Sequence, residues 1–454
     1  MQPLTNFLIS TAYAVVAVAF VLGVMILVHE FGHYAVAKMC GVRVEVFSLG
    51  FGKRLFGFRH GDTDYRVSAL PLGGYVKMAG ENPMDARTGD PGEFVSHPRW
   101  QRLLIAVAGP TMNILLAIGI VTGVFMVHYS HDWYLDQPTQ VGWVEENSPA
   151  AKAGLMPGDL ITQIDGFSNP LWEDTKAKIT ISPQQPLPIT VKRGDHTLSM
   201  TLIPETYGPN KAGEAGLEPA AGITVEAMEE SMPAYKAGIR KSDEILAVNG
   251  IALHSIGELT HFLQQDKGKP VEITALHDGR PTKYQMTPVL APNGQGEQRY
   301  RIGFSPGVRQ HVDSLTFSQA LSRSVETNKK YAFLLVELVE KMVQKKVSVK
   351  MMSGPIDIAR VSGEAAREPG WTPLLLLMAG ISLNLGIFNL FPIPILDGGV
   401  ILLLLIEGLM RRDISLHIKE RIYQAAFVFL VLFAAMVIFN DISKTVPGLS
   451  KLLP

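Results

Sequence analysis

The stretch that decides the fold runs from Phe7 to His33 and reads FLISTAYAVVAVAFVLGVMILVHEFGH. No charged residue occurs from Met1 to Val28, and the apolar run from Phe7 to Val28 is long enough to cross a hydrocarbon core of roughly 30 Å as one helix. A cleavable signal peptide is the alternative, because Ala12-Tyr13-Ala14 resembles a cleavage site. The basic leader is missing, however, and the apolar run continues past that site, so we expect a transmembrane helix.

Composition extends this expectation to the whole chain. Its 454 residues are 47% hydrophobic and 18% charged, which is too long for one domain and too apolar for an ordinary soluble protein. The net charge of -1 gives no general attraction to nucleic acid, and no nucleic-acid partner is expected. Cys40 is the only cysteine, so no intrachain disulfide can form and a metal site would rest mainly on histidine and carboxylate.

Hydropathy predicts a multi-pass α-helical membrane protein with two membrane regions, 1–130 and 372–454. Four transmembrane helices are expected, at about 7–34, 101–128, 373–392 and 423–440. The third is interrupted by glycine, serine and asparagine. The apolar segment from Val400 to Met410 is too short to cross, so we expect it to be re-entrant or interfacial.

Charge asymmetry predicts the orientation in the membrane. Residues 1–6 carry no basic side chain, whereas the loop between the first two spans is rich in them and is therefore expected on the cytoplasmic side. Both termini and the insert from about 130 to 370 then face outward, which for a bacterial inner membrane means the periplasm. The basic residues of the loop are Lys38, Arg43, Lys53, Arg54, Arg59, Arg66, Lys77, Arg87, Arg99 and Arg102.

The outward-facing insert contains an internal duplication. The segments 149–166 and 233–250 match at a constant offset of 84 residues. Each copy predicts a short helix ended by glycine, then a strand and an Asp-Gly or Asn-Gly turn. The identical positions in the first copy are Pro149, Ala150, Lys152, Ala153, Gly154, Asp159, Ile161 and Gly166.

The duplicated segments resemble the helix-to-strand core of PDZ domains, which predicts two α+β domains at 139–206 and 219–291 between the second and third spans. PDZ domains bind extended peptides at a sheet edge and often capture a C-terminal carboxylate, so peptide ends are expected partners. Alternatively, the pair acts as a steric plug over a membrane active site. No unambiguous carboxylate-binding loop is evident in the sequence, and both interpretations stay open.

A helical connector is expected at 310–365, after the repeats. Its segment 325–346 mixes leucine, valine and methionine with lysine and glutamate. This pattern is compatible with a helix lying flat on the membrane surface or with a solvated helix packed on the second repeat.

The end of the first span carries the chemistry. On a helix, His29 and His33 lie one turn apart on one face, where two imidazoles can bind one metal ion. Glu30 is then placed to take a proton from water, whose pKa zinc lowers to roughly 7. Ionisable residues cost on the order of 2.5 to 3.5 kcal/mol each within a membrane, so three of them in five positions favour a shared bound cation.

A catalytic zinc usually has three protein ligands, and Asp397 is the candidate for the third. It follows the interrupted third span, and Pro392 and Pro394 prevent a regular helix before it. Non-helical backbone at membrane depth is tolerated where it is buried in protein or lines a cavity. The alternative for Asp397 is an ordinary turn residue before Gly398-Gly399.

These motifs together resemble those of the site-2 proteases, which are intramembrane zinc metalloproteases. The resemblance rests on His29-Glu30-x-x-His33, on Ala108-Gly109-Pro110-x-x-Asn113 and on Asn389-x-x-Pro392-x-Pro394-x-Leu396-Asp397-Gly398, and it departs from the family pattern at Val400. It implies one Zn²⁺ per chain, held by His29, His33 and Asp397, with Glu30 as the general base. It further implies that Asn389 holds the substrate backbone or the oxyanion, with Asn384 as a further substrate-binding residue.

The loop at about 42–80 also has a counterpart in that family. Its strand and glycine pattern resembles a membrane-re-entrant β element that could pair with an unwound substrate, which makes Gly50 and Gly52 candidate substrate-binding residues. A cytoplasmic hairpin without substrate contact is the alternative.

The resemblance implies an endopeptidase that works within the lipid bilayer on transmembrane segments of single-pass proteins. Anti-sigma factors already cleaved on the periplasmic side, and remnant signal peptides, would be its substrates, in envelope stress signalling. A non-catalytic PDZ scaffold and a zinc transporter are the competing classes. Neither requires Glu30 between the two histidines.

Overall fold

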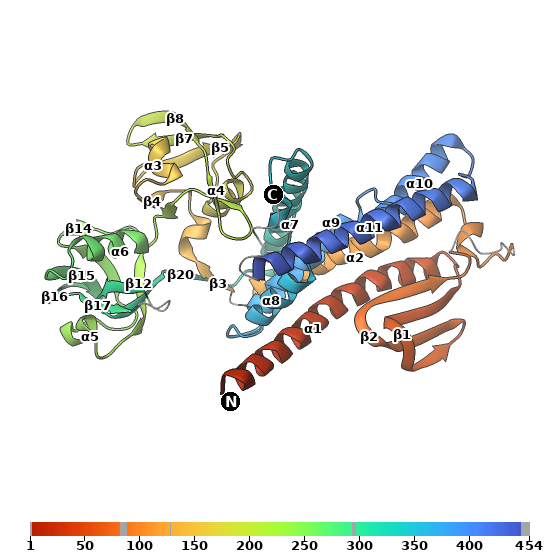
Figure 1. The fold of residues 1–454 in the computed structure, drawn as a ribbon, viewed down its shortest axis with the longest axis horizontal. Helices are drawn as coiled ribbons and strands as arrows, with labels where there is room; N and C mark the ends of the chain where they lie inside the picture. The colour runs from red at the N-terminus through yellow and green to blue at the C-terminus, as the bar shows by residue number, and fades with distance from the viewer. Residues whose placement is uncertain (1, 82–88, 128, 293–296, 446–454) are drawn as a thin grey trace. The chain divides into compact units, whose positions relative to one another are not determined.

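The computed structural model describes residues 2–81, 89–127, 129–292 and 297–445. The chain forms two compact units (Figure 1). The membrane unit comprises residues 1–129, 313–337 and 352–454, and the repeat unit comprises residues 130–312 and 338–351. Each unit is described by itself below.

Helices build the membrane unit. They are α1 (Gln2–Met39), α2 (Arg99–Met126), α8 (Pro355–Ala365), α9 (Thr372–Asn389), α10 (Asp397–Met410) and α11 (Leu416–Thr445), with the short η1 at Phe94–Ser96 and the part of α7 (Phe317–Val343) up to residue 337. Within the described residues, four helical segments are long and apolar enough to cross a membrane: Val16–Met39, Arg99–Met126, Thr372–Asn389 and Leu416–Lys444. The fourteen-residue α10 spans about 21 Å at 1.5 Å per residue, so it is too short to cross, as the sequence predicts.

Helix α2 packs between α1 and α9. Gly386 of α9 faces the backbone of Pro110 so closely that a Cβ there would lie 2.9 Å from its carbonyl oxygen. The apolar core beside this crossing contains Ala117 and Leu383. Small residues permit such close approach, and packing of this kind holds helices together in lipid.

Strands β1 (Val44–His60) and β2 (Thr63–Met78) form one curled sheet beside α1 (Figure 1). The register shows four segments, because 44–49 pairs with both 74–78 and 64–67, while 54–60 pairs with 63–68. Segment 74–78 is therefore an edge of this sheet. The bend in β1 lies at Gly50 and Gly52, which have φ of 91° and 88°. A Cβ on Gly50 would lie 2.6 Å from the carbonyl oxygen of Leu70, so this glycine has a backbone role.

The first repeat domain has an apolar core centred on Ile161, Ile164 and Val191. Its four-stranded sheet has the order β6-β5-β7-β8, and β11 pairs with β4. Its elements are β4 (Val141–Val144), α3 (Pro149–Ala153), β5 (Leu160–Ile164), β6 (Phe167–Ser168), α4 (Trp172–Thr180), β7 (Leu187–Arg193), β8 (His196–Leu202), β9 (Glu205–Tyr207), β10 (Ala212–Glu214) and β11 (Leu217–Pro219).

The second repeat domain follows the same plan around Ile223, Ile245 and Ile273. Its sheet has the order β16-β15-β13-β12-β19, which leaves β19 at an edge. Its elements are β12 (Ile223–Met228), α5 (Pro233–Ala237), β13 (Glu244–Val248), β14 (Ile251–Ala252), α6 (Ile256–Gln265), β15 (Val271–His277), β16 (Arg280–Met286), β17 (Val289–Pro292), β18 (Gln298–Arg301) and β19 (Phe304–Val308).

The structure corrects the predicted ends of both repeat domains. The expected boundaries, 206 and 291, fall short because each domain is completed by a later strand. Strand β11 pairs with β4 of the first domain, and β19 pairs with β12 of the second. A hairpin separates each closing strand from the rest of its domain, so the domains end at about 219 and 308.

The connector after the repeats contains β20 (Gln310–Asp313), α7 (Phe317–Val343), η3 (Val349–Met351) and α8, and β20 pairs with β3 (Tyr129–Asp132). The end of α7 contacts the first repeat domain, where Lys341 Nζ donates to Ser182 Oγ at 2.7 Å. The alternative of packing on the second repeat is therefore wrong for this end of the helix. Its position on a membrane surface stays a prediction.

Both repeat domains contain a buried aspartate at the same repeat position, and its basic partner differs. Asp159 is fully buried and accepts two hydrogen bonds of 2.7 Å from Arg193. The equivalent Asp243 accepts from His277 Nδ1, also at 2.7 Å. This hydrogen bond to Asp243 raises the pKa of His277 above its ordinary value near 6.5. The partner in the second domain is thus a titratable imidazole, whereas the guanidinium in the first domain keeps its charge.

We expect the second repeat domain to lose stability as the pH rises above neutrality. His277 has a raised pKa in the folded state, so its contribution is complete below about pH 6.5 and is lost as the pH rises through the folded-state value. Hydrogen exchange corrected for intrinsic rates should show β13 and β15 losing protection between pH 6 and 8.5, with β5 and β7 unchanged. The control His277→Arg copies the first domain and should make the protection of β13 and β15 as insensitive to pH as that of β5 and β7. Equal pH dependence in wild type and His277→Arg would contradict the stabilising role of His277.

Candidate active site

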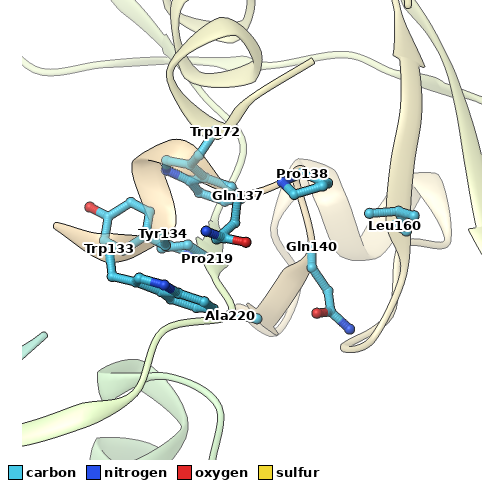
Figure 2. A pocket seen from close by; sticks show the side chains of 9 residues that line it. All are labelled: Trp133, Tyr134, Gln137, Pro138, Gln140, Leu160, Trp172, Pro219 and Ala220. Atoms are coloured by element: carbon cyan, nitrogen blue, oxygen red, sulfur yellow. The ribbon is translucent and has the colours of Figure 1, made fainter. Parts of the chain in front are cut away.

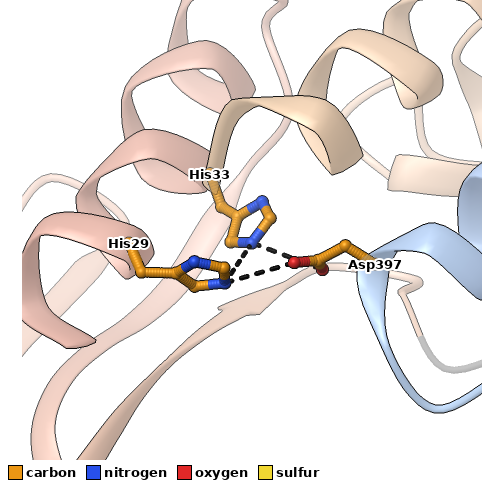
Figure 3. A group of neighbouring side chains, drawn as sticks. All are labelled: His29, His33 and Asp397. Atoms are coloured by element: carbon orange, nitrogen blue, oxygen red, sulfur yellow. Dashed lines mark hydrogen bonds and ion pairs between the residues drawn. The ribbon is translucent and has the colours of Figure 1, made fainter. Parts of the chain in front are cut away.

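Three side chains from two distant parts of the sequence meet in the membrane unit. His29 and His33 lie on consecutive turns of α1, and Asp397 is the first residue of α10 (Figure 3). His29 Nε2 lies 3.2 Å from Asp397 Oδ2 and 3.2 Å from His33 Nε2, and His33 Nε2 lies 3.5 Å from Asp397 Oδ1. The three residues that the sequence predicts as metal ligands thus lie close enough together to share one ion.

These separations fit a tetrahedral zinc ion. Ligands about 2.0 to 2.1 Å from such an ion lie about 3.3 Å from one another. The three side chains are largely buried, with exposed fractions of 9%, 12% and 22% for His29, His33 and Asp397. Two imidazole nitrogens and a carboxylate that converge in this way provide a set of lone pairs for a cation, and the donor set of two histidines and one carboxylate suits zinc.

Two glycines make room for the imidazoles where α1 crosses α2. A Cβ on Gly32 would lie 2.5 Å from the carbonyl oxygen of Ala108, so the two backbones touch at this point. A Cβ on Gly109 would come closer than 3.0 Å to both His33 Nε2 and His29 Cε1. The glycine of the Ala-Gly-Pro motif in α2 therefore leaves the space that the two histidine rings occupy.

Helix α2 also holds the far side of each imidazole ring. The Nδ1 atom of His33 lies 2.7 Å from the carbonyl oxygen of Ile105. A carbonyl can only accept, so Nδ1 carries the proton and Nε2 keeps its lone pair. The Nδ1 atom of His29 lies 3.2 Å from the carboxamide of Asn113. Outer contacts of this kind orient metal ligands and set their tautomers.

Glu30 is held at the edge of the β1–β2 sheet. Its Oε2 accepts a hydrogen bond of 3.0 Å from the backbone N–H of Val76 in the edge segment 74–78. Gly74 lies beside it, and a Cβ there would be 3.6 Å from Glu30 Cγ and 2.8 Å from the carbonyl oxygen of Ser48. One oxygen of the Glu30 carboxylate is thus fixed by the backbone of the sheet.

Asp397 is more than a turn residue before two glycines. A Cβ on Gly398 would lie closer than 3.0 Å to the carbonyl oxygen of Leu390, and one on Gly399 would do the same at Ile393. The first turn of α10 therefore packs directly on the backbone of the proline-containing loop. This packing fixes the place where Asp397 enters the site.

The remaining predicted site residues are not among the three converging side chains. Asn389 ends α9 and is partly buried, and Asn384 is exposed on the same helix. Within the described residues, no hydrogen bond or ion pair joins either asparagine to the three converging side chains. Gly50 and Gly52 form the bend in β1, and substrate contact at all four positions stays a prediction.

A cavity of about 180 Å³ lies elsewhere, in the repeat unit. Figure 2 shows Trp133 and Tyr134 of η2 (Trp133–Asp136) beside Trp172 of α4. The remaining lining residues are Gln137, Pro138, Gln140, Leu160, Pro219 and Ala220. This lining offers no acid, base, thiol or metal ligand of ordinary kind, so the cavity is no candidate for the catalytic centre.

The fold and the site fit a membrane-embedded metallopeptidase. Its candidate ligands, His29, His33 and Asp397, lie on α1 and α10, and Glu30 is adjacent to His29 in the sequence. The model of peptidase family M50 matches residues 17–433. The chain therefore belongs to peptidase family M50 and is a zinc metalloprotease, which confirms the resemblance found in its motifs.

Relatives in several bacteria match almost the whole chain. It is 32% identical to the regulator of sigma-E protease RseP of Salmonella typhimurium, over 96% of this chain and 100% of that protein. It is 31% identical to RseP of Escherichia coli, over 93% and 97%. A Vibrio cholerae protein named as a candidate zinc metalloprotease is 31% identical over 94% and 98%.

Among solved structures, the chain is similar to the PDZ domain of an SdrC-like protein of Listeria monocytogenes. The likeness covers 19% of this chain and 87% of that chain, at 21% identity and a TM-score of 0.17. This score is too low to establish a shared fold.

Sequence reasoning missed the residues that hold the site from outside. Val76 contacts Glu30 through its backbone, so its side-chain identity carries no signal. Gly109 and Asn113 belong to a motif that the sequence displays, but the motif does not say which histidine each one faces. Their roles depend on the crossing of two helices.

We expect Gly109→Ala to abolish stoichiometric zinc binding. The added methyl group would overlap both imidazole rings, so the helices or the rings must move and the ligand atoms would no longer converge. Metal content measured after purification should fall from about one zinc per chain to a small fraction of that. Gly119→Ala is the matched control, because a Cβ there meets nothing within 4 Å on the same helix. Full zinc content in both variants would refute this role.

Proposed function

We propose that this chain hydrolyses peptide bonds within transmembrane segments of single-pass membrane proteins, using one zinc ion. The observation that carries the proposal is the convergence of His29 and His33, on a helix of membrane-spanning character, with Asp397 at the start of α10, next to Glu30. A soluble peptidase would not need a site of this kind on such helices. A metal transporter would not need an acid held beside the ligands by the N–H of Val76.

The chemistry follows from the arrangement of the side chains. When bound to His29, His33 and Asp397, zinc would supply a Lewis acid that makes water a better nucleophile and polarises a carbonyl. Glu30 takes a proton from the attacking water and later donates it to the leaving amine. Its bond to Val76 keeps the carboxylate oriented during this exchange. Asn389 is proposed to donate to the developing oxyanion.

We further propose that the substrate is extended along the β1–β2 sheet. A helix hides its peptide bonds in internal hydrogen bonds, so the substrate must unwind before water can attack. The edge segment 74–78 adjoins Glu30 and pairs on one side only with 44–49. The N–H groups of Val76 and Met78 donate to Glu30 and Glu81, so an added strand would pair through the remaining groups of this edge. Gly50 and Gly52 would let the sheet bend around such a strand.

The biological setting is proposed from the relatives. Two of them are named regulators of sigma-E, so anti-sigma factors trimmed on the periplasmic side are proposed as substrates, with remnant signal peptides as a further class. The proposed location is the inner membrane of a bacterium, with both termini and the repeat unit in the periplasm. The active site then lies near the cytoplasmic side.

We expect Glu30→Gln to lower cleavage of a transmembrane model substrate by about 10²-fold or more, since loss of a general base typically costs 10² to 10⁴. Zinc content should stay at the wild-type level, because Glu30 is not one of the three converging ligands. Gel-based cleavage in detergent and metal analysis measure the two quantities. The exposed Glu368→Gln is the control and should cleave normally. Cleavage that survives Glu30→Gln would contradict the role of Glu30 as the general base.

We also propose that the two repeat domains are PDZ domains and that the second receives peptide C-termini. The structure reveals equivalent glycine loops before β11 and β19, namely Glu214-Ala-Gly-Leu217 and Arg301-Ile-Gly-Phe304. Their glycines, Gly216 and Gly303, have φ of 67° and 95°. Consecutive backbone N–H groups in such a loop form a site for a carboxylate.

The two loops differ in charge. In the first domain, the N–H groups of Ala215 and Gly216 already donate to the carboxylate of Glu214, at 3.2 and 3.3 Å. In the second domain, the equivalent position is Arg301, whose guanidinium donates to Glu229 and to the carbonyl of Pro292. An anionic peptide end would therefore be repelled from the first loop, whereas in the second loop it could exchange with Glu229 for the guanidinium of Arg301.

The closing strands also restrict how a peptide can bind. Pro219 in β11 and Pro306 in β19 lack an N–H, so a strand added at either edge finds one donor missing. Binding in the second domain would then depend mainly on the terminal carboxylate. A substrate whose N-terminal part stays anchored in the membrane after a cut in the periplasm would present such a terminus.

We expect the full-length protein to bind a fluorescent peptide with a free, apolar C-terminal residue about tenfold or more tightly than the same peptide with a C-terminal amide, since hydrogen bonds to charged groups contribute about 1.5 to 3 kcal/mol. Fluorescence anisotropy measures both affinities. Arg301→Glu should remove the preference, whereas Arg299→Glu, two residues away on β18, should keep it. Equal binding of acid and amide would favour the steric plug instead.

A further inference from the structure

Asn113 is a polar side chain fully buried within a membrane-spanning helix. It lies on α2, one turn after Gly109, and its exposed fraction is 0%. Its carboxamide nitrogen is placed 3.2 Å from His29 Nδ1, and its carboxamide oxygen is buried without a hydrogen-bond partner. Burial of an amide without hydrogen bonds costs free energy, so such a residue calls for an explanation.

The two orientations of the carboxamide have different consequences for His29. If the nitrogen faces the ring, it donates to Nδ1, and the proton of the neutral ring must then sit on Nε2, where it blocks a metal. If the oxygen faces the ring, it accepts from Nδ1–H and leaves the Nε2 lone pair free. Oxygen and nitrogen of an amide are assigned by such hydrogen-bond logic, since they are otherwise nearly indistinguishable.

His33 shows which orientation the site requires. Its Nδ1 faces the carbonyl oxygen of Ile105 at 2.7 Å, an acceptor that allows only the Nδ1–H tautomer. The Nε2 atoms of both rings converge on Asp397, so His29 needs the same tautomer. Asn113 is the group in contact with His29 Nδ1, and only its oxygen can supply an acceptor there.

We propose that Asn113 is a positioning residue for zinc binding: its carboxamide oxygen accepts from His29 Nδ1–H and so holds the Nε2 lone pair toward the metal. This inference rests on the proposed role of His29 as a ligand. The backbone of Asn113 is itself held across the helix crossing, because Ser382 Oγ of α9 donates to its carbonyl oxygen at 2.9 Å. Helix α9 thus supports the contact from the other side of α2.

The test replaces Asn113 either with aspartate, which keeps an acceptor oxygen, or with leucine, which is apolar and of similar size. Zinc affinity, measured by competition with a chelator, should fall about 10- to 100-fold in Asn113→Leu, the usual cost of removing an outer-shell partner. Asn113→Asp retains an acceptor oxygen and should stay within about threefold of wild type. Selective ¹⁵N labelling of histidine, with His29 assigned by its substitution, should show the Nδ1–H tautomer in wild type and Asn113→Asp and a mixture in Asn113→Leu.

Ser324→Ala is the control for packing. It removes a buried hydrogen bond of 2.8 Å from α7 to the carbonyl oxygen of Ile118 on α2, away from Asn113 and the imidazole, so zinc affinity and the His29 tautomer should not change. Wild-type zinc affinity in Asn113→Leu, or equal losses in Asn113→Leu and Asn113→Asp, would overturn the proposal. Failure of the wild-type protein to bind zinc would instead overturn the proposed function, so the two failures are distinguishable.

Discussion

The close crossing of α1 and α2 is the constraint on which the rest of the site depends. At Gly32 the backbone of α1 touches the backbone of α2, and at Gly109 the missing side chain leaves space for two imidazole rings. Lipid offers no hydrophobic drive to associate helices, so contact of this kind must come from close packing and polar bonds. The His-Glu-x-x-His motif of α1 and the Ala-Gly-Pro motif of α2 therefore act as one structural unit. One provides the rings and the other provides the space for them, while Ile105 and Asn113 of α2 contact the far sides of the rings.

Sequence could predict those parts of the site that the chain presents as side chains in a recognisable order. The spacing of His29 and His33 follows from the pitch of a helix, and Asp397 stands out as an acid within an apolar, proline-rich segment. The four long apolar helices follow from hydropathy in the same way. What sequence could not supply were contacts made by backbone atoms. The N–H of Val76 and the carbonyl of Ile105 act without regard to the side chains at those positions.

The repeat domains also contain features that the sequence did not predict. Their duplication was visible because a helix, a glycine and a strand recur at one offset, but their closing strands and glycine loops were missed. Each loop lies after a hairpin, and the second copy carries extra residues there, so the constant offset fails. The two domains keep the same fold but differ at equivalent positions, and these positions can be matched only in the structure. Arg193 and His277 serve equivalent aspartates, and Glu214 and Arg301 occupy equivalent loop positions with opposite charge.

The hairpin between α1 and α2 links the base of the reaction to the surface that we propose for the substrate. Glu30 would be a costly group at this depth if it had no partner. Its partner is a backbone N–H on an open sheet edge, and the curl that brings this edge to α1 depends on bends at glycine. A strand that joined this edge, as we propose for the substrate, would lie beside Glu30. Extension of the substrate and its delivery to the proposed base would then be a single event.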